Sequence, residues 1–459
     1  MSEKELEGQP QEARVQEGEK KSSRDLAEIS QGLANFGGFA VLETTVEGAK
    51  NMNPEKRARK KIFLTETSYK SERELLKARI NLWLKVLGSG GEITEMIDKC
   101  AENSDKAEKL LNKNLKKITD DIKNLERSYR SVAFFFKGAG TDKVKNLTVV
   151  NASMDQVTDL DTPLVFDKVY NEFRDKFDRL DLMNNYSLMA IPGYMKNKQV
   201  IDKWGKMAHD SKVMLVTDFR NLESPDDVME LFEDEKLTGA DEFKANIIMG
   251  CNWLVGRERH ENLGEEETVY VPSAGAMVGN IYKTKMSQVA AGKKYGVLNE
   301  VSGVKFDMRA NEIAAIEKLG LVPVVKEYGQ VMAFSAKTLF NGNNIGKQTY
   351  SVVRVFDWVT KSLIDYLNRV LFQNIDTNMK VDVRREIAKF LDSNQGPGKL
   401  IEKFKILECE VDKKKRDKVN IKLHIVPYFP AKNFAIKLDG MKGDDPSNPN
   451  WTADFEEEN

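Results

Sequence analysis

Beyond Ala133 the sequence alternates short apolar segments with amphipathic segments, and this alternation limits the chain to a small set of folds. Apolar runs of about four to eight residues predict buried strands, and apolar residues at helical spacing predict helices that pack on them. We expect strands over residues 186–191 and 213–216 and helices over residues 194–207 and 225–232. Strands and helices in alternation indicate α/β construction, with some mixed α+β character.

Further elements are predicted on both sides of this region. Thr162 and Pro163 open a helix, because a proline in the first helical turn loses no hydrogen bond. Its apolar face is formed by Val165, Val169, Phe173 and Phe177. Towards the C-terminus we expect helices over residues 352–372 and 381–391 and strands over residues 404–411 and 419–427.

Residues 71–131 have helical rather than strand periodicity. A first helix carries Leu76, Ile80, Leu82 and Leu84, and the glycines of residues 88–91 end it. A second helix is expected to begin at the N-cap Ser104, with Asp105 and Glu108 in its first turn.

Six apolar residues of this second helix recur at alternating steps of four and three, which aligns them along one side. They are Leu111, Leu115, Ile118, Ile122, Leu125 and Tyr129, and we call them the apolar seam. The seam can pack in the core of this chain or against a helix of a separate partner, and the sequence leaves both possibilities open.

The two ends of the chain differ from its centre in composition. Residues 1–30 are rich in Glu, Gln, Lys and Gly and have almost no apolar side chains, so we expect a mobile arm. Residues 36–45, FGGFAVLETT, form an isolated β-prone segment that has no neighbouring strand in the sequence. The tail after Met441 is expected to be acidic and solvated.

Charge, cysteines and hydropathy exclude several classes of protein. The formal charge of −1 gives no field that would attract nucleic acid or a membrane surface. Three cysteines far apart in the sequence do not suit a disulfide framework and favour a reducing compartment. No apolar run approaches the ~20 residues that span a bilayer, and the start of the sequence has no signal-peptide core. We therefore expect a cytoplasmic protein without membrane insertion.

The motifs that would indicate an enzyme are incomplete. GNNIGKQ at residues 342–348 has too few residues between its glycines for a phosphate-binding loop, and glutamine follows its lysine. Ser273 lacks the flanking glycines of a nucleophile elbow, and the three histidines occur singly. Asp218 follows a predicted strand, but a cap or loop role is the simpler interpretation. We predict no catalytic, cofactor-binding or metal-binding residue.

The run VPSAGAMVGN at residues 271–280 contains two glycines four residues apart. Gly275 and Gly279 would let two backbones approach closely or adopt unusual torsions. The run is therefore interpreted as structural.

Several segments taken in order resemble contractile sheath proteins. Residues 271–284, 297–339 and 349–373 are similar to successive segments of phage tail sheaths, and Pro427, Pro430, Ala431 and Phe434 match their closing strands. Residues 118–136 and 162–173 resemble helices of the large sheath subunit of type VI secretion systems, the TssC/VipB-like proteins. The departures from the usual pattern suit a divergent subtype such as the one found in Bacteroidota.

The resemblance implies a contractile tail-sheath fold with an N-terminal helical region and flexible terminal arms. The expected division is an arm at 1–35, an exchange strand and linker at 36–67, and a helical region at 68–135. An α/β sheath domain at 136–345, a C-terminal sheath domain at 346–440 and an acidic tail at 441–459 would follow.

The resemblance also implies a structural protein of the bacterial cytoplasm, in an apparatus anchored to a membrane. Its expected partners are a small sheath subunit (TssB/VipA-like) at the apolar seam, further copies of itself, an inner tube (Hcp-like), a baseplate and an AAA+ recycling unfoldase. The expected strand-exchange residues are Phe39, Val41, Leu42, Phe434, Ile436 and Leu438, and the expected tube-facing residues are Lys380, Arg384, Arg385 and Lys389.

Three alternatives stay open. A phage-like sheath protein would assemble without a small partner. An α/β hydrolase or nucleotide-dependent enzyme is compatible with the strand and helix alternation alone. A nucleic-acid scaffold is the third class, and the balanced charge counts against it.

Overall fold

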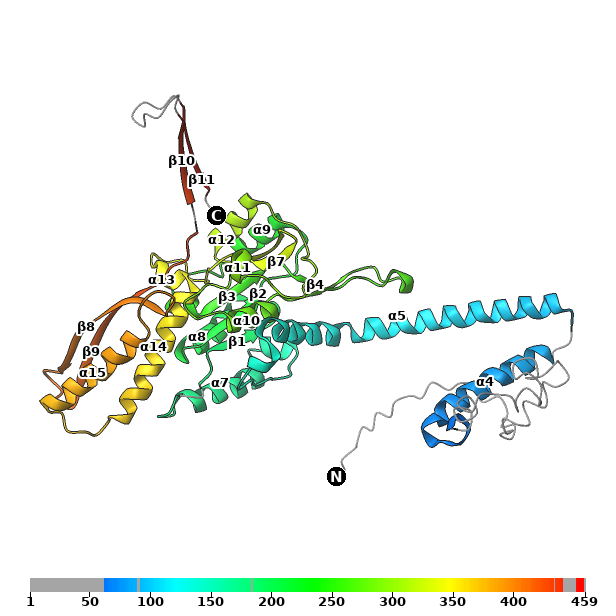
Figure 1. Cartoon of the computed structure of the whole chain (residues 1–459), viewed down its shortest axis with the longest axis horizontal. Helices are drawn as coiled ribbons and strands as arrows, with labels where there is room; N and C mark the ends of the chain where they lie inside the picture. The colour runs from blue at the N-terminus through cyan, green and yellow to red at the C-terminus, as the bar shows by residue number, and fades with distance from the viewer. Residues whose placement is uncertain (1–61, 89–90, 183–184, 433, 441–450, 458–459) are drawn as a thin grey trace. The chain divides into compact units, whose positions relative to one another are not determined.

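The chain consists of two units, Met1–Leu115 and Lys116–Asn459, which we describe separately. The computed structural model describes residues 62–88, 91–182, 185–432, 434–440 and 451–457 (Figure 1). The predicted arm at 1–35 and the exchange residues Phe39, Val41 and Leu42 lie outside these residues.

The first unit is helical where it is described. It contains the 3-10 turn η2 (Thr67–Tyr69), helix α4 (Lys70–Leu87) and the start of helix α5 (Ile93–Ala139). The predicted N-cap at Ser104 is wrong, because α5 begins at Ile93 and passes through Ser104 without a break. Residues 93–103 continue the amphipathic pattern with Glu95 in the first turn, so the helix needs no cap at Ser104. The predicted boundary between residues 135 and 136 also falls within α5.

A five-stranded sheet forms the centre of the second unit, in the order β1-β2-β3-β6-β7. Its strands are β1 (Leu188–Ile191), β2 (Met214–Asp218), β3 (Ile247–Cys251), β6 (Val322–Glu327) and β7 (Gln330–Ala333). The first four strands are parallel, and β7 is antiparallel to β6. Every residue of β2 and β3 is buried, as expected when helices cover both faces of a parallel sheet. The predicted α/β class is confirmed.

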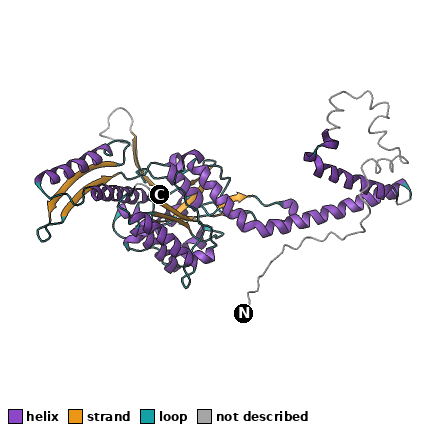
Figure 2. Ribbon diagram, turned by 90° about the horizontal axis from the view of Figure 1, so that it is seen from below, coloured by secondary structure: helices purple, strands orange, loops and turns teal. Residues whose placement is uncertain are grey.

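The two faces of the sheet belong to two cores, and Figure 2 shows helices on both sides of the strands. Leu215 and Met249 face the core that contains helices α8 (Lys198–Asp210), α9 (Pro225–Glu235) and α12 (Ala310–Leu319). Val216 and Ile248 face the core that contains helix α10 (Ala274–Lys283) and Phe134 of α5. The alternation of side chains along each strand produces this division.

The remaining elements of this region are short or lie at its periphery. They are η3 (Thr141–Lys143), α6 (Met154–Thr158), α7 (Leu164–Phe177), η4 (Glu242–Asn246), β4 (Leu254–Arg257), η5 (Glu261–Leu263), β5 (Val269–Val271), α11 (Gly292–Tyr295) and α13 (Ile345–Gln348). We refer to residues 116–349 as the α/β body.

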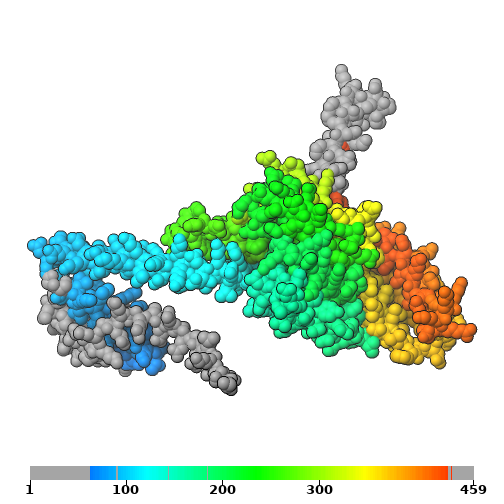
Figure 3. Space-filling view, turned by 180° about the vertical axis from the view of Figure 1, so that it is seen from behind, coloured from blue at the N-terminus to red at the C-terminus, as the bar shows by residue number. Residues whose placement is uncertain are grey.

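A second substructure follows, which we call the C-terminal subdomain. It contains α14 (Tyr350–Arg369), α15 (Thr377–Ser393), β8 (Ile401–Val411) and β9 (Val419–Pro427). The antiparallel strands β8 and β9 pack with both helices around a separate apolar core. In the space-filling view this subdomain, yellow to orange, lies against the green α/β body (Figure 3).

The chain ends in a pair of antiparallel strands, β10 (Phe434–Gly440) and β11 (Trp451–Glu457). Residues 451–457, which the sequence analysis placed in the acidic tail after Met441, therefore form a strand. Trp451, Ala453 and Phe455 alternate with polar residues, which is a strand pattern that the surrounding acidic residues obscured.

Candidate partner-binding surfaces

The apolar seam of α5 is exposed along its whole length. None of its six residues is buried, and Leu125 and Tyr129 are 71% and 73% exposed. The residues of the seam that lie in the second unit are Ile118, Ile122, Leu125 and Tyr129. An exposed apolar row of this kind is typical of an interaction surface, whereas isolated exposed apolar residues are common on any protein.

A different side of α5 is held by ion pairs to the hairpin of β4 and β5. Arg257 binds Glu126 through its Nε at 2.9 Å and Glu265 through its Nη1 at 2.6 Å. Arg130 of α5 donates to the carbonyl of Gly256 at 2.8 Å. The hydrogen bond from Arg257 lowers the pKa of Glu265 to about 2. These contacts hold this part of α5 on the α/β body and leave the apolar seam accessible.

The last turns of α5 pack closely on α10, the helix that contains Gly275 and Gly279 of the run VPSAGAMVGN. A Cβ atom at Gly275 would lie 2.5 Å from Ser131 Oγ, and one at Gly279 would overlap the carbonyl oxygen of Phe135. The pair of glycines four residues apart is therefore a helix-packing site, as the structural interpretation predicted. Residues 274–280 of the run lie in α10, a helix that was not predicted from the sequence.

Gly279→Ala is expected to destabilise the chain by about 1–3 kcal/mol, because the added methyl group must push α10 away from α5. Gly239→Ala is the matched control, because the added Cβ would meet no atom closer than 3.6 Å. Urea unfolding followed by circular dichroism measures both. Equal midpoints for the two variants would show that the helices do not depend on this close approach.

Asp218 and Ser273 form a buried structural cluster, and neither is accessible to a substrate. Asp218 Oδ1 accepts hydrogen bonds from Ser273 Oγ at 2.7 Å and from the backbone N–H of Ala274 at 2.9 Å. Its Oδ2 accepts one from the backbone N–H of Gly193 at 2.9 Å. Burial raises the pKa of Asp218 to about 6. The carboxylate thus fixes the start of α10 to the end of β2.

The described residues contain neither a metal-binding cluster nor a membrane-spanning helix. No group of three His, Cys, Asp or Glu side chains in that part of the chain could hold a metal ion. The GNNIGKQ segment lies partly in the short helix α13, whose N-cap is Asn344. Within the same residues, no helix is long and apolar enough to cross a bilayer.

The predicted tube-facing residues all lie on α15, but their surroundings differ. Arg384 and Lys389 are exposed. Lys380 pairs with Glu410 at 3.2 Å, and Arg385 pairs with Asp382 at 2.9 Å. Val383, Ile387 and Leu391 of the same helix are buried and hold it in the C-terminal subdomain.

A groove between α15 and β8 adds an apolar floor to this basic surface. Its volume is about 560 Å³, and its lining residues are Val381, Arg384, Arg385, Ala388, Lys405 and Ile406. Arg384 and Arg385 were predicted from the sequence, whereas Lys405 and Ile406 were not, because β8 approaches α15 only in the folded chain.

The predicted exchange residues Phe434, Ile436 and Leu438 all lie in β10. They stand opposite Glu457, Phe455 and Ala453 of β11 in the antiparallel register. One edge of β10 is therefore paired within the chain itself. The sequence analysis did not predict this partner strand.

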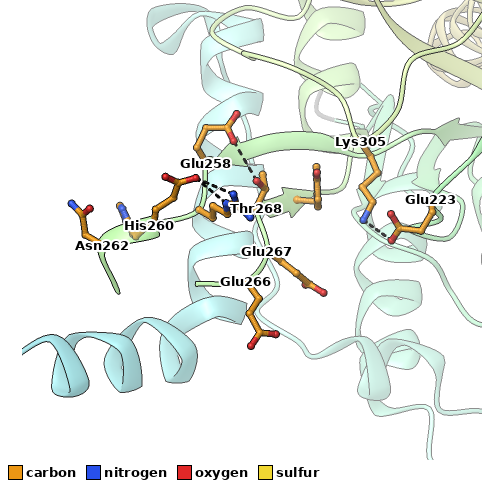
Figure 4. Close-up of a pocket in the computed structure, with 11 residues that line it drawn as sticks. Glu223, Glu258, His260, Asn262, Glu266, Glu267, Thr268 and Lys305 are labelled. Carbon is orange, nitrogen blue, oxygen red and sulfur yellow. Dashed lines mark hydrogen bonds and ion pairs between the residues drawn. The ribbon is translucent and has the colours of Figure 1, made fainter. Parts of the chain in front are cut away.

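An acidic hollow beside the hairpin of β4 and β5 is a feature that the sequence analysis missed (Figure 4). Its volume is about 860 Å³, and Glu223, Glu258, Glu261, Glu266 and Glu267 contribute to its lining. Lys305 pairs with Glu223 at 2.7 Å and lies over the ring of Tyr270. The acidic run at residues 265–267 was the only signal of it in the sequence.

The sequence matches family descriptions over most of its length, and all of them name a type VI secretion component. They are the central domain of the type VI secretion system protein TssC/VipB over residues 117–341, a TssC/VipB-like C-terminal domain over residues 349–457, and a TssC/VipB-like N-terminal region over residues 26–115. The chain belongs to the TssC/VipB family.

The chain is also similar to solved structures of contractile sheaths. The contracted helical sheath of the anti-feeding prophage is 14% identical with a TM-score of 0.46, covering 66% of this chain and 78% of that chain. The contracted sheath complex of an extracellular contractile injection system, PVC, is 15% identical with a TM-score of 0.43, covering 57% and 71%. The sheath tail protein of Desulfitobacterium hafniense is 12% identical with a TM-score of 0.36, covering 54% of each chain. A comparison with curated protein sequences found no match.

Proposed function

We propose that this protein is the large structural subunit of a contractile sheath, and that it polymerises with a small sheath protein around an inner tube. The observation that carries the proposal is the exposed apolar seam of α5 in a chain of the TssC/VipB family. Sheath contraction then propels the tube during type VI secretion, in the cytoplasm of a bacterium and within a membrane-anchored apparatus.

The seam supports a helical partner because of its geometry. Residues at steps of four and three present one continuous apolar row, which is the pattern that a second helix covers in a coiled coil. Burying a Leu or Ile side chain contributes roughly 1.5–3 kcal/mol, and five of the six residues of the seam are Leu or Ile. The small sheath subunit supplies this helix. The protein encoded beside this chain is the candidate to test, by pull-down and size-exclusion chromatography.

Work in such an assembly requires no active site. The energy of contraction is a difference in packing between two arrangements of the same subunits, so interfaces with two stable arrangements replace reactive groups. Strand exchange keeps neighbouring subunits joined while they slide. We assign this role to Phe39, Val41 and Leu42 and to Phe434, Ile436 and Leu438.

The basic surface of α15 is assigned to the inner tube. Arg384, Arg385 and Lys389 present positive charge beside the apolar floor of the groove. An acidic or mixed surface of the tube protein would fit this combination. The baseplate and an AAA+ unfoldase are further partners that the family implies. A divergent subtype, such as the one in Bacteroidota, accounts for the departures from the usual sequence pattern.

Reversing two charges on α15 tests the tube assignment. Arg384→Glu with Arg385→Glu is expected to leave sheath formation intact but to reduce tube protein in the sedimented sheath by about tenfold, since charge complementarity becomes repulsion. Lys414→Glu with Arg416→Glu, in the loop between β8 and β9, makes the same change of charge away from the groove. If both double variants retain the tube equally, α15 does not face it.

A further inference from the structure

Helix α14 has two chemically different faces, and each face contacts a different part of the molecule. Val355, Val359, Leu363 and Leu367 pack in the apolar core of the C-terminal subdomain. The other face is polar, with residues at steps of three and four. Its members are Arg354, Asp357, Lys361, Asp365 and Asn368, and we call them the polar face of α14.

The centre of the polar face binds two loops and one side chain of the α/β body. Lys361 Nζ donates to the carbonyl of Tyr186 at 2.7 Å and to the carbonyl of Lys212 at 2.9 Å. One turn earlier, Asp357 accepts a hydrogen bond from Asn246 Nδ2 at 2.7 Å. Each of these donors and acceptors can form a hydrogen bond of similar strength with water.

The two ends of the polar face repeat this arrangement. Asp365 accepts from the backbone N–H of Leu182 at 2.9 Å, and Asn368 donates to the carbonyl of Leu180 at 3.0 Å. At the other end, Arg354 donates to the carbonyl of Ile281 at 3.4 Å. Each side chain of the polar face therefore contacts the α/β body through a hydrogen bond.

The first turn of α14 is attached differently. Tyr350 is buried in the core on the α10 side of the sheet, and its hydroxyl accepts a hydrogen bond from the backbone N–H of Ala290 at 2.8 Å. Val353 packs against the same core. This turn lies in the core of the α/β body, whereas the later turns of α14 share with the body only the packing of Met286 among the described core residues.

The contact of α14 with the α/β body is weaker than its contact with its own subdomain. Separating α14 from its own subdomain would expose a continuous apolar surface to water, whereas separating the polar face from the body would exchange hydrogen bonds for hydrogen bonds with water. Burial also disfavours the charged side chains, because it lowers the pKa of Lys361 to about 8 and that of Arg354 to about 10. Arg354 Nε is buried with no hydrogen-bond partner among the described residues.

We propose that the C-terminal subdomain turns as one unit about the first turn of α14 when the polar face separates from the α/β body. The loop at residues 285–287 must yield as well. Its contacts are the hydrogen bonds from Lys285 and Ser287 to the carbonyls of Gly398 and Lys399 and the packing of Met286. Such a motion gives the chain two arrangements without unfolding either core. It concerns the chain alone and does not require that the chain form a sheath.

The motion is measured by electron spin resonance distances on the full chain. Spin labels are placed at the exposed residues Glu230 of α9 and Lys422 of β9, with the exposed Cys100 replaced by serine. In the wild type we expect one distance between the labels, the closed distance, in which the polar face of α14 contacts the α/β body. Lys361→Glu puts a carboxylate against two carbonyl groups, so we expect part of the population to shift to a second distance. Circular dichroism should retain the wild-type helix content.

Two further variants keep the test decisive. Leu363→Ala, on the apolar face, should lower the melting temperature and leave the closed distance unchanged. If Lys361→Glu unfolds the chain, Asp365→Ala should still populate the second distance. It removes the contact to Leu182 and the ion pair with Arg369 on the same helix. A single unchanged distance in Asp365→Ala, or in a folded Lys361→Glu, would overturn the proposal.

Discussion

Ile122→Asp combined with Leu125→Asp is expected to abolish co-purification of this chain with the small sheath protein. Both side chains are exposed in the apolar seam, and both would have to lie in the interface with the partner helix. Losing two buried apolar side chains and burying two carboxylates should weaken binding by at least ~100-fold. Pull-down of the tagged small subunit from a co-expressing cell measures the loss.

The control adds the same charge to another side of the same helix. Asn124→Asp with Ser128→Asp places two carboxylates on α5 away from both the seam and the hairpin contacts of Glu126 and Arg130. This variant should bind as the wild type does. Retained binding by the seam variant would remove the seam from the interface, and loss in both variants would indicate an effect on α5 as a whole.

Asp218→Ala is expected to destabilise the α/β body by about 3–5 kcal/mol. The substitution leaves the backbone N–H groups of Ala274 and Gly193 buried without an acceptor, and it leaves the Ser273 hydroxyl only the weak acceptor Met277 Sδ at 3.6 Å. Each unsatisfied buried donor costs about 1–3 kcal/mol, and partial relaxation reduces the sum. Chemical denaturation of the purified chain measures the change.

Asp218→Asn tests whether the hydrogen bonds of Asp218 account for its effect on stability. Its amide oxygen can still accept from Ser273 and Ala274, while its NH2 group faces the N–H of Gly193. We expect the loss in stability to be about half of that in Asp218→Ala. Unchanged stability in both variants would contradict the structural assignment of Asp218.

Local patterns in the sequence predicted several of the elements, including β1 and β2, but not β3, β6 and β7 of the central sheet. The strand over residues 419–427 matches β9 at both ends, and the predicted helix over residues 225–232 begins with α9 at Pro225. These elements have strong period-two or helical patterns and clear end signals such as Ser224 before Pro225. Where a weaker signal stood alone, as at Ser104, the capping interpretation was wrong.

Features that depend on contacts between distant residues were not predictable. The side of α5 that packs on the β4–β5 hairpin is determined by the ion pair of Glu126 and Arg257, which lie 131 residues apart in the sequence. The role of Asp218 depends on Ser273, which arrives at the same place only when α10 packs on the sheet. The spacing of Gly275 and Gly279 indicated a close approach, but only the structure identifies Ser131 and Phe135 as its partners.

The contacts of the polar face of α14 could not be predicted from the sequence either. The apolar residues of this helix were visible in the sequence because they share one face. Nothing in the sequence marked Lys361 and Asp365, because their partners are backbone groups of residues 180–212. No periodicity in the sequence reports such partners.

Negative-stain electron microscopy of this chain, expressed alone and together with the small protein encoded beside it, tests the sheath proposal most directly. Hollow striated tubules that form only on co-expression are the predicted result. Tubules from this chain alone would instead indicate a phage-like sheath protein. Soluble monomers in both samples would contradict the proposal that this chain polymerises into a sheath.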